Sequence, residues 1–300
     1  FFPRIGVYLG LVLLVNVVPY VAGVFWGAPL ASREFETGTQ DVVWQQSVTR
    51  RRWLAIKVGL IGLIAMAAAA LAVVAVSWWS RPLDATAISG ISRISPAIFD
   101  ARGYAVLGHT ALAFTLGVTV GLLVRRTLPA MAITFTVLVA IQIVVPTIVR
   151  PHYAAPARIE TAITADNIAG VTTTADGTAR GLLVDAGPAR AWILSNRTVN
   201  AAGHPVNVLP AWVADCATPD APAGEVAQGQ CLDRLAAAGY RQAVTYHPAN
   251  RFWLFQAYET VIFTMLSLLL FWFCFLRIAP GPPRAGHRLT GWPRPDVRSC

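Results

Sequence analysis

Long apolar runs separated by short polar breaks make up most of this chain. Five runs have the roughly 20 mostly apolar residues that a helix needs to cross a bilayer. They cover residues 5–26, 53–79, 104–124, 129–149 and 253–276. The pattern predicts a mainly α-helical, polytopic membrane bundle with five visible spans, of which the first four belong to residues 1–149.

The stretch before the last span, residues 150–252, has a different pattern. Asp176-Gly177 lies between two short apolar segments, residues 171–174 and 181–184, and this arrangement predicts a β-hairpin. Further strands are predicted over 191–194, 206–209 and 240–246, and a helix closed by glycine is predicted over 230–239. We therefore expect a small α+β domain here.

Basic residues gather next to the ends of the apolar runs. One group lies at residues 50–57, a second is Arg125-Arg126, and a third follows the last span in the tail, residues 278–300. Positively charged loops face the cytoplasm, so residues 150–252 are expected outside the cell and the tail inside. The first visible span would then begin outside, and we expect a sixth native span before Phe1, with both termini cytoplasmic.

Composition supports a multi-pass protein of the cell membrane. Only 13% of the residues are charged, whereas soluble proteins average roughly 25%. The net charge of +9 does not indicate nucleic acid as a partner, because the arginines lie where a membrane protein places them, in contact with lipid headgroups.

The cysteines predict a disulfide and no metal site. Cys216 and Cys231 both fall in residues 150–252, on the side where disulfides persist, and two unpaired thiols are the alternative. No cysteine–histidine cluster has the spacing of a zinc site.

A few polar or small residues interrupt the spans. His109, Gln142 and Glu259 are of the type that faces a bundle interior or a cavity, either in a transport pathway or in a structural hydrogen bond. His109 and Glu259 are expected near the outer ends, within reach of water. Gly117 and Gly121 form a small-xxx-small pattern, which permits close helix packing within one subunit or between two.

The polar break at residues 31–52 has an ordered composition. Glu34 and Glu36 stand at its front and arginines at its back, and Thr39 is a predicted N-cap for a helix through residue 46 that carries Trp44. A loop that binds only lipid headgroups would explain the arginines, but not the acids, the glycine and the aromatic residues.

This break resembles the cytoplasmic signature of type 2 ABC-transporter permeases. The resemblance rests on residues 33–39 (Arg-Glu-Phe-Glu-Thr-Gly-Thr), residues 46–50 (Gln-Ser-Val-Thr-Arg) and Lys57. Residues 44–57 and 243–259 are also similar to an actinobacterial branch of that family.

The resemblance implies a permease subunit of an ABC exporter. Such a subunit pairs with a second copy, as a homodimer or a related heterodimer, and rests on a cytosolic ATPase through the segment 33–50. The implied ATPase-coupling residues are Arg33, Glu34, Glu36, Gly38, Thr39, Trp44 and Arg50. The expected cargo is amphipathic: a drug, an antibiotic or a lipid-like molecule.

The chain is not expected to be an enzyme by itself. It contains no G-x-x-x-x-G-K-[ST] loop, so ATP and Mg would be held by the partner subunit, and no cofactor by this chain. The alternative class is a non-transporting sensor or assembly module whose outer domain binds a ligand or protein. An intramembrane enzyme is a third class, but the G-x-S-x-G nucleophile elbow is absent.

Overall fold

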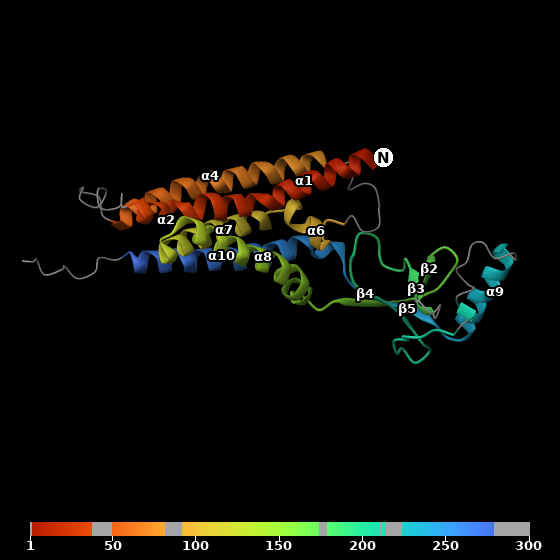
Figure 1. Ribbon diagram of the computed structural model, residues 1–300. Coiled ribbons are helices and arrows are strands. Elements are labelled where there is room, and N and C mark those ends of the chain that lie inside the picture. The colour runs from red at the N-terminus through yellow and green to blue at the C-terminus, as the bar shows by residue number, and fades with distance from the viewer. Residues whose placement is uncertain are drawn as a thin grey trace, which may run out of the picture.

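The computed structural model describes residues 2–37, 50–81, 92–173, 179–210, 212–213 and 224–278. Five of its helices are long and apolar enough to cross a membrane: Gly6–Thr37, Ala55–Trp79, Ala105–Val124, Thr127–His152 and Ala249–Arg277. They lie side by side as a bundle, and a small sheet region lies beyond one end (Figure 1). The predicted polytopic bundle with a small sheet region before its last helix is confirmed.

The first long helix has three parts. These are α1 (Phe2–Tyr20), the π-helical turn η1 (Val21–Gly27) and α2 (Ala28–Thr37). The remaining helices of the bundle are α4 (Arg50–Trp79), α7 (Ala105–Val124), α8 (Thr127–Val144) with the π-helical turn η3 (Val145–Val149), and α10 (Phe252–Arg277). Two short elements, α6 (Pro96–Phe99) and the 3₁₀ turn η2 (Asp100–Arg102), precede α7. We call the end of the bundle near the strands the sheet end, and the opposite end the Thr37 end.

The first span was predicted to end at Trp26, but the helix that carries it does not end there. The helix continues through η1 and ends only at Thr37. The reason is that Ala28, Ala31 and the small Ser32 remain buried along one face, whereas Arg33 and Glu36 are exposed on the others. An apolar stripe of helical period is sufficient to continue a helix past the point where mean hydropathy falls.

Helix α7 is the centre of the bundle. Of the most apolar stretch of this helix, 72% of the residues are buried, compared with 17% in the span of α4 and 11% in that of α8. The first helix, α4, α8 and α10 therefore surround α7, and their outer faces are apolar and exposed, as expected of helices that face lipid.

Glycines bring α7 and the first helix into backbone contact. A Cβ atom added at Gly117 would lie 2.2 Å from the carbonyl oxygen of Gly23, and one at Gly121 would lie 2.4 Å from that of Ala28. The reverse holds for Gly27, where a Cβ would lie 2.5 Å from the carbonyl oxygen of Phe114. The small-xxx-small pattern thus packs within one subunit in this structure.

The strands form two antiparallel sheets. One has the order β1 (Ala157–Ala162), β5 (Arg241–His247), β4 (Trp192–Val199), and the other pairs β2 (Ile168–Thr173) with β3 (Ala179–Val184). Helix α9 (Gly224–Ala237) packs against the two-stranded sheet through Leu232 and Leu235. Gly239, with φ of +75°, follows α9 in the left-handed conformation that commonly ends a helix.

Two details of this region differ from the sequence prediction. Residues 206–209 are not a strand, and only an isolated bridge joins Val199 to Pro205. Prolines at 205 and 210 cannot donate to a ladder, which limits pairing there. Strand β1 was not predicted, because all six of its residues are partly or fully exposed in a sequence without clear alternation.

We predict that Gly117→Ala destabilises the bundle by about 2 kcal/mol, because the added methyl group overlaps a backbone atom that cannot rotate away. Gly59→Ala is the matched control, since no atom lies within 4 Å of a Cβ there. Thermal unfolding in detergent should show a lower midpoint for Gly117→Ala only. Equal midpoints for both variants would contradict the close contact.

Candidate functional site

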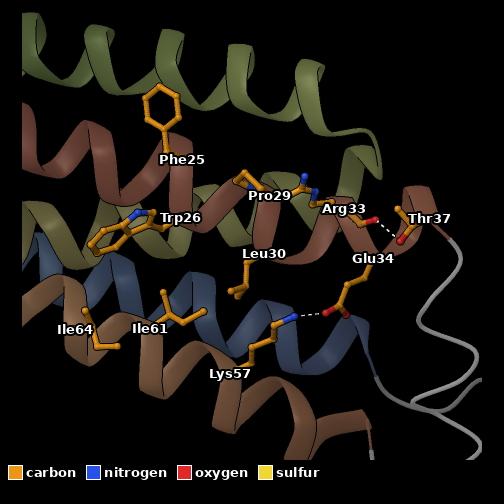
Figure 2. A pocket seen from close by; sticks show the side chains of 10 residues that line it. All are labelled: Phe25, Trp26, Pro29, Leu30, Arg33, Glu34, Thr37, Lys57, Ile61 and Ile64. Carbon is orange, nitrogen blue, oxygen red and sulfur yellow. Dashed lines mark hydrogen bonds and ion pairs between the residues drawn. The ribbon is translucent and has the colours of Figure 1, made fainter.

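Two acids of the polar break, Glu34 and Glu36, have partners inside the subunit. Glu34 on α2 forms an ion pair with Lys57 on α4, through Oε1 and Nζ. The two side chains are partly exposed, 20% for Glu34 and 33% for Lys57. Figure 2 shows the pair bridging the two helices near the point where α2 ends. The end of α2 is therefore attached to the start of α4.

Glu36 attaches the same end of α2 to the turn between α7 and α8. Its Oε2 accepts hydrogen bonds from the Thr127 backbone N–H at 3.0 Å and from the Thr127 hydroxyl at 2.6 Å. Thr127 is the first residue of α8, where free N–H groups and the helix dipole favour a negative charge. Phe35 adds a contact with the Arg125 guanidinium, 5.2 Å from its ring centre.

A groove runs between the first helix and α4 beside the Glu34–Lys57 pair. Its volume is 630 Å³, and its lining changes from apolar to charged along its length. Trp26, Ile61 and Ile64 line the apolar part, whereas Arg33, Glu34 and Lys57 line the polar part (Figure 2). A groove of this kind matches an amphipathic molecule, with the polar group toward the Thr37 end.

The remaining predicted coupling residues are only partly covered. Gly38, Thr39 and Trp44 lie outside the described residues, and so does the helix predicted to begin at Thr39. Arg50 is the first residue of α4, and Arg33 is exposed near the end of α2. Cys231 lies in α9, while Cys216 is outside the described residues, so the disulfide stays a prediction.

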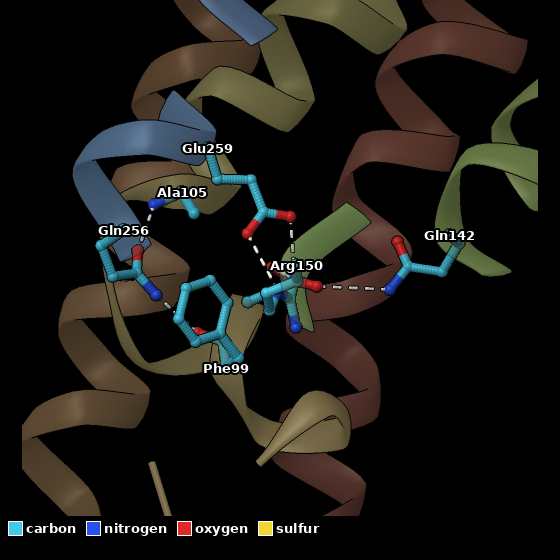
Figure 3. Close-up of polar contacts among 7 residues, drawn as sticks. Phe99, Ala105, Gln142, Arg150, Gln256 and Glu259 are labelled. Atoms are coloured by element: carbon cyan, nitrogen blue, oxygen red, sulfur yellow. Dashed lines mark hydrogen bonds and ion pairs between the residues drawn. The ribbon is translucent and has the colours of Figure 1, made fainter. Parts of the chain in front are cut away.

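A second polar cluster lies at the sheet end, and it includes two of the predicted span residues. Glu259 on α10 accepts hydrogen bonds from Arg150, at 3.1 Å from Nε and 2.8 Å from Nη2. Arg150 Nη2 also donates to Asp100 at 3.0 Å, and Gln142 donates to Asp100 at 3.4 Å. Figure 3 shows Gln142, Arg150 and Glu259 converging from three elements.

The expectation that water reaches His109 and Glu259 is wrong. His109 is 5% exposed and Glu259 is 1% exposed. The short elements α6 and η2 cover this end of the bundle, and His109 packs against the ring of Phe263 with 4.9 Å between centres. Gln256, one turn before Glu259, binds the Phe99 carbonyl and the Ala105 N–H and so holds these elements in place.

Sequence reasoning missed Asp100 and Arg150 as site residues. Position 150 was noted only as the start of the stretch 150–252, and Asp100 was not singled out. An unmatched acid in a loop and an arginine at a span end are a weak signal, since both residue types are common at such places.

The fold and these contacts define a multi-pass helical membrane protein. At the Thr37 end of the bundle, polar contacts join three parts of one subunit: α2, α4 and the start of α8. Residues 2–150 match the family model described as "ABC-2 membrane transporter related". The match supports an ABC-2 type permease, which is a membrane transport subunit without a catalytic centre of its own and a partner of an ABC ATPase. No curated protein and no solved structure matches the chain.

We predict that Glu34→Lys and Lys57→Glu each lower the stability by about 1 kcal/mol, a modest value because the pair is partly exposed to solvent. The double variant, with the charges exchanged, should recover most of the loss. Glu160→Lys is the control, since its pair with Arg158 is exposed on β1. Unfolding midpoints measure the effect. A double variant less stable than either single variant would contradict the pairing.

Proposed function

We propose that the chain is the permease subunit of an ABC exporter, driven by a separate cytosolic ATPase that holds ATP and Mg. The observation that carries this proposal is the attachment of the end of α2 to two other parts of the subunit. Glu34 links it to α4 and Glu36 links it to α8. A movement imposed on the segment after Thr37 would thus reach three helices together: the first helix, α4 and α8.

The mechanical step follows from these contacts. The ATPase would dock on the segment 33–50 and move it when the ATPase pair closes on ATP. Because α2 is one continuous helix with α1 and contacts α7 through Gly121 and Ala28, the movement would pass along the first helix into the centre of the bundle. Packed helices transmit such displacements as rigid bodies.

The proposed cargo is amphipathic, a drug, an antibiotic or a lipid-like molecule. The groove beside Glu34 and Lys57 supports this class, since it offers an apolar wall and charged groups together. Two copies of the subunit, identical or related, would enclose the translocation pathway. Residues 150–252 would lie outside the cell, where a Cys216–Cys231 disulfide would persist.

We predict that Glu36→Gln leaves a co-purifying ATPase bound but lowers cargo-stimulated ATP turnover several-fold, because α2 loses its charged contact with α8. Thr127→Val should have the same effect, since it removes the hydroxyl partner. Glu160→Gln on β1, away from this end, is the control. ATP turnover and retention of the ATPase are measured on the same preparation.

The outcomes of this experiment separate coupling from docking. Unchanged turnover in both variants would overturn the role of the Glu36–Thr127 contact. If no ABC ATPase binds the unmodified chain, the exporter proposal fails, and a sensor or assembly module remains.

A further inference from the structure

A small pocket lies between the ends of α7 and α10, at the Thr37 end of the bundle, and we call it the α7–α10 pocket. Its volume is 390 Å³, and residues of both chain segments line it. Leu123 and Phe273 give it an apolar wall, whereas Arg125 and Arg277 bring two guanidinium groups. Arg125 follows the last residue of α7, and Arg277 is the last residue of α10. Two positive charges therefore share one pocket.

Contacts between the two helices form the buried side of this pocket. Thr119 on α7 and Cys274 on α10 belong to its lining, and their hydroxyl and thiol groups lie 3.2 Å apart. Closer to the middle of the bundle, the Thr115 hydroxyl donates to the Ser267 hydroxyl at 3.1 Å. These contacts hold α7 and α10 at a fixed separation, so the pocket is part of the packed bundle.

Neither arginine of the pocket has a carboxylate partner among the described residues. The Arg125 guanidinium lies 5.2 Å from the ring centre of Phe35, and that of Arg277 lies 5.1 Å from the ring centre of Phe273. Contacts with aromatic rings orient a guanidinium but do not neutralise its charge. Both guanidinium groups are thus held at the pocket with their charge intact.

The acids of α2 at this end of the bundle are already engaged elsewhere. Glu34 pairs with Lys57, and Glu36 accepts hydrogen bonds from Thr127. The carboxyl ends of α7 and α10 compensate part of the arginine charge, since each helix end carries roughly half a negative charge. Two such ends amount to about one negative charge against two positive charges. The pocket therefore retains a net positive charge that suits an anion.

The location of the pocket indicates where this anion comes from. The spans of α7 and α10 end at Val124 and Arg277, so the pocket lies at the level where lipid headgroups meet the acyl chains. Leu123 and Phe273 lie before the two arginines along their helices, on the side of the bilayer interior. Leu123 is 53% exposed, so an acyl chain can reach this wall from the lipid.

We propose that the α7–α10 pocket binds one anionic phospholipid of the surrounding leaflet. Its phosphate would lie between Arg125 and Arg277, and one acyl chain would lie along Leu123 and Phe273. The planar fork of arginine matches the oxygens of a phosphate group. Basic pockets between membrane helices bind headgroups of this kind. The apolar wall favours a lipid over free phosphate, which has no apolar part to place there.

A lipid bound in this way connects α10 to the polar contacts of the Thr37 end. Arg125 lies in the turn before Thr127, and Thr127 is the residue that holds Glu36 of α2. The lipid would therefore join the end of α10 to the turn that α2 also contacts.

The test is native mass spectrometry of the full chain in detergent with phosphatidylglycerol or phosphatidylcholine of identical acyl chains. Phosphatidylglycerol should bind more tightly by on the order of tenfold. Arg125→Gln and Arg277→Gln should each weaken its binding about fivefold and leave that of phosphatidylcholine unchanged. Arg126→Gln is the matched control, because Arg126 is exposed in the same turn but does not line the pocket. Equal affinities for the two lipids, or an equal loss in Arg126→Gln, would overturn the proposal.

Two further measurements distinguish a lipid from a free anion and do not depend on any variant. Inorganic phosphate in large excess should leave phosphatidylglycerol bound, and displacement of the lipid by phosphate would show a free-anion site instead. Phosphatidylglycerol with a photoreactive group on its acyl chain should label the peptides that contain Leu123 and Phe273. Labelling confined to other helices would contradict the assigned position.

Discussion

Backbone contact between α7 and the first helix is the constraint on which the rest of the structure depends. Gly117 and Gly121 face Gly23 and Ala28 so closely that no side chain fits between them. In a membrane, helices gain little from the hydrophobic effect against one another, so close packing supplies much of their association. This contact fixes how far the first helix extends beside α7. It therefore also fixes where the polar end of the first helix, at Thr37, lies.

The two ends of the bundle use charge differently. At the Thr37 end, Glu34 and Glu36 make partly exposed contacts that can break and form again at small cost. At the sheet end, Arg150 is buried between Asp100 and Glu259, and removal of one partner leaves a charge without compensation. The first end is suited to movement, and the second end holds the sheet region against the bundle.

The sequence predicted the five spans because length and hydropathy alone decide whether a helix can cross a bilayer. It predicted strands β3, β4 and β5 from short apolar segments, and the end of α9 from Gly239. It could not show that Glu34 and Glu36 have internal partners. Lys57 is 23 positions from Glu34 and Thr127 is 91 positions from Glu36, and contacts at such separations depend on how the helices pack.

The site at the sheet end shows the same limit more clearly. Arg150 and Glu259 are 109 positions apart, and only the three-dimensional packing reveals that they share a buried site with Asp100. The acids of the polar break were recognised as functional candidates from their order along the chain. The residues that these acids contact, by contrast, could be identified only from the structure.

In the proposed function, a cytosolic ABC ATPase delivers force at the end of α2. A photo-cross-linking amino acid at Thr37, in membranes that contain the candidate ATPase, tests it most directly. We expect that the ATPase is captured at Thr37, that the yield changes with ATP, and that the same group at Arg158 on β1 captures none. Equal capture at both positions, or none at Thr37, would contradict it.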